Sequence, residues 1–325
     1  MKNVLEWLEA TVAKYPDKPA FSDTESSITF RQVYDIARNT GAYLIGQLGV
    51  DRTPVAVFAG RKMVTPAYFL GVVYAGRPYA PIDASLPDKR IEKILENLSP
   101  RAIVADRESF EHVESIVDEL AKSEGFYRPQ IFVAEDISRF KKVVCDDSSP
   151  DMLAAVRRQM SMTDPLYIIY TSGSTGNPKG VMTSHLSLMT YINAYCDVMH
   201  IEGEDVLGNQ SPLDYIAAIR DIYLPLKTGC STAIIPKEYF MEPNVLFDYM
   251  NEKRVSSVGW SVSAFTILTS LGAFEETGLK SLRKICFSGS VMPCMVLRKW
   301  QKNLPEAHFV NQYGPTEATA SCTYY

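Results

Sequence analysis

The sequence has no long apolar run, no basic run and no paired cysteines, and each absence excludes a class of protein. No window approaches about 18 uninterrupted apolar residues, so no segment is a candidate membrane span. Residues 1–9 carry charge where a signal peptide needs an apolar stretch, which favours a cytoplasmic protein. A net charge of −5 repels a phosphate backbone and argues against nucleic acid as a partner.

The cysteines and histidines are too scattered to form a recognisable site. None of the six cysteines belongs to a Cys-x-x-Cys pair, so the spacing supports neither a zinc site nor a disulfide framework. The four histidines lack ligand or triad spacing, and we assign them no chemistry. We expect most of the cysteines to be small buried hydrophobic side chains.

The chain does contain enough apolar residues for a large core. Its 325 residues are 46% hydrophobic, which leaves room for about two domain-sized units. Apolar strand-like segments alternate with helix-like ones in both halves, a pattern that predicts an α/β fold with two mostly parallel sheets flanked by helices. The polar stretch 145–151 is the best candidate linker, giving subdomains of about 1–150 and 151–325, although a surface loop would look the same.

Several elements are predicted by their spacing. Apolar residues on one helical face predict helices near 1–15, 33–46, 69–74 and 90–98. Strands are expected at 55–58, 80–83, 102–104, 166–170, 232–235, 255–259 and 284–287. Ser184 is a candidate N-cap of the helix that begins at His185.

The most informative segment runs from Leu166 to Gly180, where an apolar strand leads into a loop rich in glycine and hydroxyl side chains. Glycines let a backbone fold closely around an anion, while hydroxyls and Lys179 can reach its oxygens, so phosphate is the expected guest. A Walker A loop is excluded, because Pro178 precedes the lysine and Gly180 follows it. A short glycine-serine loop by itself would also suit an exposed turn.

The whole of this segment resembles the phosphate-loop signature of the adenylate-forming superfamily. That superfamily includes acyl-CoA synthetases, luciferases, adenylation domains of nonribosomal peptide synthetases and D-alanine:carrier-protein ligases. Three further motifs occur in the same order: residues 28–34 resemble an early Leu-Thr-Tyr motif, residues 70–83 resemble one typical of the amino-acid-adenylating branch, and residues 313–317 match Tyr-Gly-Pro-Thr-Glu. The resemblance covers nearly all of the chain and implies the large N-terminal domain of these enzymes.

The resemblance implies an enzyme that joins a carboxylate to the α-phosphate of ATP, with Mg²⁺ as the second cofactor. It implies that Thr316 donates to the α-phosphate, that Glu317 holds the metal ion and that Tyr313 stacks on adenine. The implied catalytic residues are Lys179, Thr316 and Glu317. The implied cofactor-binding residues are Thr171, Ser172, Gly173, Ser174, Thr175, Gly176, Lys179, Ser288, Gly289, Asn311, Gln312, Tyr313, Gly314 and Thr316.

The segment that would form the acyl pocket departs from the family pattern. Amino-acid-activating members carry an Asp that pairs with the substrate ammonium, and the matching position here is Ile216, with Asp214 two residues away. In the same register Arg220 and Trp260 would face the pocket, which suggests a substrate with a second anionic group or an acid without an α-amine. Arg220 could equally pair with Asp221 or Asp214 and never meet substrate. The predicted pocket is Asp214, Ile216, Arg220, Trp260, Ser288 and Gln312.

Family members continue past the Tyr-Gly-Pro-Thr-Glu motif into a small C-terminal domain, which these 325 residues do not contain. The resemblance therefore implies a truncated large domain that binds nucleotide weakly and adenylates slowly. Two functions remain open. One is a ligase that passes its acyl group to the thiol of a carrier protein or coenzyme A, with residues 79–83 favouring the carrier protein. The other is a non-catalytic nucleotide-binding or docking module that keeps the phosphate loop.

Overall fold

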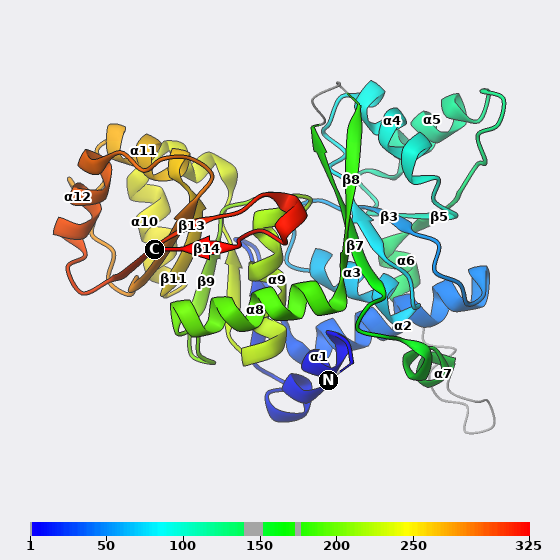
Figure 1. The fold of residues 1–325 in the computed structure, drawn as a ribbon, viewed down its shortest axis with the longest axis horizontal. Helices are drawn as coiled ribbons and strands as arrows, with labels where there is room; N and C mark the ends of the chain where they lie inside the picture. The colour runs from blue at the N-terminus through cyan, green and yellow to red at the C-terminus, as the bar shows by residue number, and fades with distance from the viewer. Residues whose placement is uncertain (1, 140–151, 173–176) are drawn as a thin grey trace. The chain divides into compact units, whose positions relative to one another are not determined.

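The computed structural model describes residues 2–139, 152–172 and 177–325 and divides into two compact units, shown in Figure 1. Unit 1 comprises Met1–Pro16 and Phe30–Met189, and unit 2 comprises Asp17–Thr29 and Thr190–Tyr325. The suggested linker at 145–151 lies outside the described residues, and the two strands that follow it belong to unit 1. The expected fold, with two mostly parallel sheets flanked by helices, is confirmed.

Unit 1 is built on a six-stranded sheet with the order β6-β5-β3-β4-β7-β8. Neighbouring strands are parallel except that β8 runs against β7. β3 is apolar and buried along its whole length, as expected for a parallel strand covered on both faces. The strands are β3 (Val55–Phe58), β4 (Tyr79–Pro81), β5 (Ala102–Ala105), β6 (Gln130–Val133), β7 (Pro165–Ser172) and β8 (Pro178–Ser184).

Helices of unit 1 bury an apolar face against this sheet or against one another, and the helix Thr65–Tyr74 is buried on every side. α4, for example, buries Ile91, Ile94, Leu95 and Leu98, which recur at helical spacing. The helices are α1 (Leu5–Lys14), α2 (Phe30–Leu48), α3 (Thr65–Tyr74), α4 (Asp88–Leu98), α5 (Phe110–Leu120), α6 (Ala134–Ser138) and α7 (Met152–Gln159). α8 (His185–Met199) begins in unit 1 and ends in unit 2.

Unit 2 is built on an eight-stranded sheet with the order β14-β13-β12-β11-β9-β10-β1-β2. The six inner strands are parallel, and the edge strands β2 and β14 run against their neighbours. The strands are β1 (Pro19–Ser22), β2 (Ser27–Thr29), β9 (Val206–Asn209), β10 (Ser231–Ile234), β11 (Ser257–Ser261), β12 (Lys284–Ser288), β13 (His308–Tyr313) and β14 (Thr323–Tyr324).

The helices of unit 2 follow the inner strands. They are α9 (Ile219–Thr228), α10 (Pro243–Glu252), α11 (Val262–Ser270) and α12 (Cys294–Asn303), with short 3₁₀ turns at η1 (Ile216–Ala218), η2 (Lys237–Met241) and η3 (Thr316–Ala318). Trp260 and Trp300 are fully buried in the core between the sheet and α10, α11 and α12. Within the described ranges of the chain, no helix combines the length and apolar composition that a membrane span needs.

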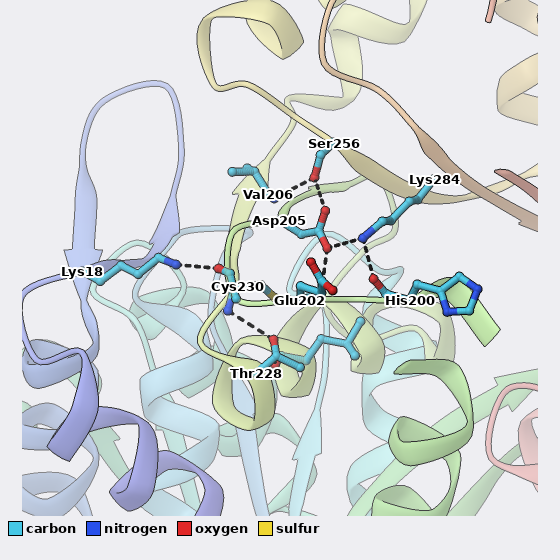
Figure 2. Close-up of polar contacts among 11 residues, drawn as sticks. Lys18, His200, Glu202, Asp205, Val206, Thr228, Cys230, Ser256 and Lys284 are labelled. Atoms are coloured by element: carbon cyan, nitrogen blue, oxygen red, sulfur yellow. Dashed lines mark hydrogen bonds and ion pairs between the residues drawn. The ribbon is translucent and has the colours of Figure 1, made fainter. Parts of the chain in front are cut away.

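A buried carboxylate ties the amino ends of three strands of unit 2 together. Figure 2 shows Asp205 accepting hydrogen bonds from Lys284 Nζ at 2.6 Å and from Ser256 Oγ at 2.7 Å. The backbone N–H of Glu202 donates to the same carboxylate at 2.8 Å, and Lys284 Nζ also donates to the carbonyl of His200. Because Asp205, Ser256 and Lys284 each lie next to or at the start of a strand, this cluster fixes the starts of β9, β11 and β12.

In unit 1, His185 is a buried neutral base at the start of α8. Its side chain is 1% exposed, and the backbone N–H of Val4 donates to its Nδ1 at 3.5 Å. Burial lowers the pKa of the imidazole to about 4. The preceding Ser184 Oγ accepts from the backbone N–H of Ser187 at 3.2 Å, which confirms the predicted N-cap.

Acidification should weaken unit 1 through His185. The pKa is about 4 in the folded chain and about 6.5 when unfolded, so between these values the unfolded chain binds more protons. The stability supplied by the neutral ring is therefore complete above pH 6.5 and is lost as the pH falls towards 4. We expect the free energy of unfolding to fall by about 1 kcal/mol between pH 7 and pH 5.5 because of this group. In urea denaturation, the free energy of unfolding of His185→Gln should depend less on pH over this range. The same pH dependence in the variant and the parent chain would contradict the assignment to His185.

Candidate functional site

The glycine-rich segment of unit 1 connects two paired antiparallel strands. Thr171 in β7 lies opposite Lys179 in β8, and Ser172 lies opposite Pro178. The side chain of Lys179 is exposed. The four predicted phosphate-binding residues between these strands, Gly173, Ser174, Thr175 and Gly176, lie outside the described residues. The described part of the segment is thus the paired ends of β7 and β8, with Lys179 as the second residue of β8.

Tyr170 and Gly180, which lie opposite one another in β7 and β8, pack closely together. A Cβ on Gly180 would lie 2.9 Å from Ile168 Cγ2 and 3.1 Å from Tyr170 Cζ, so only glycine lets the Tyr170 ring lie over the neighbouring strand. The Tyr170 hydroxyl donates to Asn97 Oδ1 in α4 at 2.8 Å. Burial raises the pKa of Tyr170 to about 12, which keeps the hydroxyl neutral and able to donate.

The second group of predicted site residues lies at the carboxyl ends of two parallel strands in unit 2. Ser288 ends β12, while Asn311, Gln312 and Tyr313 end the adjacent β13. Ligands of open α/β sheets bind at the carboxyl ends of strands. Gly289 follows β12 with a φ of +96°, a conformation that glycine adopts without strain.

The turn after β13 holds the remaining predicted nucleotide contacts. Tyr313 is 71% exposed, so its ring is accessible for stacking. A Cβ on Gly314 would lie 2.4 Å from Ser321 Cα, so glycine lets the turn pack tightly against the chain that returns to β14. Thr316 and Glu317 lie in η3, with Thr316 partly buried and Glu317 exposed.

The donor set around Glu317 suits magnesium bound together with a nucleotide. Mg²⁺ keeps several waters and binds through one or two carboxylates plus substrate phosphates rather than in an all-protein cage. Among the residues that the structure describes, no three His, Cys, Asp or Glu side chains gather into a metal site. The single exposed carboxylate of Glu317 therefore suits a magnesium ion whose other ligands are waters and substrate phosphates.

Arg220 is buried in unit 2 and lies against the sheet rather than at a surface. It is 3% exposed, and its Nε lies 3.6 Å from Asp221 Oδ1. Burial alone would lower the pKa of this guanidinium, but the neighbouring Asp221 carboxylate raises it above the ordinary value. Asn209 Nδ2 donates to Asp221 Oδ2 at 2.8 Å. Of the pairings that the sequence left open, the one with Asp221 is observed.

Arg220 and Trp260 lie on opposite faces of β11. A Cβ on Gly259 would lie 2.2 Å from Arg220 Nε, so the guanidinium occupies the space on the Gly259 face of the strand. Successive side chains of a strand alternate between faces. Trp260 accordingly packs on the other face, with its ring centroid 5.0 Å from that of Phe240 and its Nε1 donating to the carbonyl of Gly208. The structure therefore does not bring these two predicted pocket residues together.

The other predicted pocket residues differ in exposure. Ile216 is 6% exposed and sits in η1, so it packs in the core of unit 2. Asp214 is partly buried in the preceding loop. Gln312 is 6% exposed, and its Oε1 accepts from Ser321 Oγ at 3.2 Å. Sequence reasoning missed Gly259 and Asn209, although a glycine inside an apolar strand is a known sign of close approach.

Comparison with known proteins identifies a family and relatives that this chain resembles. A family model described as "AMP-binding enzyme" matches residues 8–325. A D-alanine--D-alanyl carrier protein ligase of Bacillus cereus is 30% identical over 321 residues, which are 98% of this chain and 60% of that protein. The chain thus spans 60% of the length of this curated relative.

Two solved structures share the fold. The complex of VinN with L-aspartate has a TM-score of 0.82 at 19% identity and covers 98% of this chain and 78% of that one. The AMPPNP-bound form of the nonribosomal peptide synthetase FmoA3 has a TM-score of 0.82 at 21% identity, with 99% of this chain and 32% of that one covered. Because the family model spans almost every residue, this chain belongs to the AMP-binding enzyme family.

Proposed function

We propose that the chain activates a carboxylic acid with ATP. The carboxylate oxygen attacks the α-phosphorus, a bond forms between them, and the bond from the α-phosphorus to the oxygen bridging the β-phosphate breaks. The electron pair leaves with pyrophosphate, and the acid becomes an acyl-adenylate. The family match over residues 8–325 carries this proposal.

The residues of the two units suit different parts of this reaction. In unit 1, Lys179 and the hydroxyls of Thr171 and Ser172 would bind the β- and γ-phosphates, because a lysine and hydroxyl groups neutralise and hydrogen-bond phosphate oxygens. In unit 2, the exposed ring of Tyr313 would stack on adenine and Thr316 would donate to the α-phosphate. Positioning and charge stabilisation are the main contributions that a protein makes to phosphoryl chemistry.

Magnesium would be held by Glu317. The exposed carboxylate could bind the ion while waters and phosphate oxygens complete its coordination. When bound, the ion supplies positive charge to the phosphate oxygens and so makes the α-phosphorus easier to attack.

The acyl acceptor would be the thiol of a carrier protein, with coenzyme A as the alternative. The similarity to the D-alanine--D-alanyl carrier protein ligase of Bacillus cereus supports the first. A carrier-protein ligase that uses ATP would act in the cytoplasm. Because the chain spans 60% of that relative, we expect these 325 residues alone to bind ATP more readily than they adenylate.

The acid would be an amino acid or a related acid. Asp214, which is partly buried and lies two residues before Ile216 in the sequence, is the carboxylate that could pair with a substrate ammonium, since Ile216 is apolar and buried. Arg220 already has the Asp221 carboxylate beside it. A second anionic group on the substrate is therefore not needed to balance its charge.

Pyrophosphate exchange tests the proposal. Incorporation of radiolabelled pyrophosphate into ATP should depend on an added acid, and a panel of D- and L-amino acids, aryl acids and dicarboxylic acids should identify which acid. Titration of the same protein with ATP separates binding from chemistry. Acid-dependent exchange, however slow, supports the proposal. ATP binding with no acid-dependent exchange at all would favour a nucleotide-binding module instead, and the absence of ATP binding would contradict both functions.

A further inference from the structure

The chain turns back on itself after β13 and returns in β14. The two strands pair in antiparallel fashion, and Figure 1 shows them side by side. Next to this pairing, the backbone N–H of Cys322 donates to the carbonyl of Tyr313 at 2.9 Å. The loop enclosed by that bond, residues 314–321, includes Thr316 and Glu317 in η3. The proposed contacts with the α-phosphate and with magnesium therefore both lie on this loop.

The two residues that follow η3 have a strained backbone. Thr319 has a φ of +55° and Ala320 a φ of +72°, which lie in the left-handed region that favours glycine. This region is unfavourable for any residue with a Cβ, and a side chain that branches at Cβ, such as threonine, adopts it still less often. Local preference therefore opposes the path of the loop after η3. Such a path persists only where surrounding contacts hold it.

Ser321 supplies the side-chain contact that closes the loop. Its Oγ donates to Oε1 of Gln312 in β13 at 3.2 Å, and the accepting side chain is buried. Its main chain is also tightly packed, because a Cβ on Gly314 would lie 2.4 Å from Ser321 Cα and 2.8 Å from the carbonyl oxygen of Ala320. The backbone N–H of Ser321 donates to the carbonyl of Thr319 at 3.0 Å. Ser321 thus joins the strained pair to the end of β13.

We propose that Ser321 is a positioning residue for the nucleotide and acts through the loop that carries Thr316 and Glu317. Without the bond to Gln312, the strained backbone after η3 relaxes, and the two side chains leave their places at the carboxyl end of β13. A loop that is already in place loses less conformational entropy when a ligand binds. The inference rests on the proposed function, in which this loop contacts the α-phosphate.

Titration with AMP tests this role. AMP has the α-phosphate but neither the β- nor the γ-phosphate, so its binding to the 325-residue chain reports on the contacts proposed for unit 2. We expect Ser321→Ala to raise the dissociation constant for AMP about fivefold, as suits the loss of one hydrogen bond. Ser270→Ala is the matched control, because it removes a hydroxyl that donates to the carbonyl of Thr266 within α11 at 3.0 Å. AMP binding by this control should not change.

Relief of the strain should restore binding in the absence of the Ser321 hydroxyl. Glycine adopts a positive φ without penalty, so Ala320→Gly added to Ser321→Ala should return the dissociation constant to within about twofold of the parent value. Such recovery would also show that the single variant is not weakened by a general loss of the fold. A hydroxyl that touched the nucleotide directly could not be replaced in this way. Absence of recovery in the double variant would therefore overturn the proposal.

Hydrogen exchange of the Cys322 amide gives a second readout, which needs no nucleotide. This amide closes the loop through its bond to Tyr313, so it should exchange faster in Ser321→Ala and regain protection in the double variant. Parent-like exchange or parent-like AMP binding in Ser321→Ala would overturn the proposal. If the parent chain binds ATP but not AMP, the role of this loop fails while the proposed function stands. If it binds neither nucleotide, the proposed function fails as well.

Discussion

Replacing Gly259 with alanine should destabilise unit 2 by about 2–4 kcal/mol, because the new methyl group would overlap a buried charge. The added Cβ would lie 2.2 Å from Arg220 Nε and 2.4 Å from its Cζ. An exposed arginine would swing aside at little cost. This guanidinium is 3% exposed and beside Asp221, so displacing it separates a buried ion pair.

Thermal or urea denaturation would measure the loss. Gly278→Ala is the matched control, since Gly278 lies in the same unit and a Cβ there would meet nothing within 4 Å. A second comparison identifies the cause. In an Arg220→Met background the Gly259→Ala change should cost less, because the group that it strikes is gone. Equal costs in both backgrounds would assign the effect to something other than the guanidinium.

Replacing Glu317 with glutamine should abolish the metal dependence of nucleotide binding and slow adenylation about a hundredfold, as expected when a charge-stabilising group is lost. Glutamine keeps the shape of the exposed side chain but loses the negative charge that attracts Mg²⁺. ATP affinity measured with magnesium and with EDTA should differ for the parent chain and coincide for the variant. Pyrophosphate exchange measures the effect on chemistry.

Glu306→Gln provides the control for this second experiment. Glu306 is exposed and precedes β13, so the substitution Glu306→Gln removes the same charge from a position nearby in the sequence. It should retain both the magnesium effect and the exchange rate. If Glu317→Gln still binds ATP more tightly with magnesium than with EDTA, another residue holds the metal ion.

The sequence was sufficient to predict the class of the fold and half of the strands that the structure describes. Mostly apolar segments of three to five residues predicted β3, β5, β7 and β12 within one or two residues, because buried parallel strands are apolar on both faces. β11 was placed two residues too early, since the buried Val255 suggested a strand start but the ladder begins only at Ser257. The β8 strand was missed because its residues, Pro178–Ser184, are mostly polar or small.

The arrangement of side chains was harder to predict than the elements. Family spacing assigned both Arg220 and Trp260 to the acyl pocket, but gave no information on the face of the sheet that each would occupy. Their separation follows from the alternation along β11, together with the packing of Trp260 against Phe240. The hydrogen bond from Tyr170 to Asn97 had no local signal in the sequence, because only the packing of α4 beside the β7–β8 hairpin brings the two residues together.

The early strands of unit 2 have a consequence for the order of folding. Phe21 in β1 pairs with Thr232 in β10, so β1 finds this partner strand only after the chain between them, which includes every strand of unit 1, has been made. Contacts between such distant segments are slow to form, because a long loop must close first. Unit 1 can therefore assemble before β1 and β2 join the sheet of unit 2. Deleting residues 17–29 would leave β10 as a bare edge open to pairing with other chains.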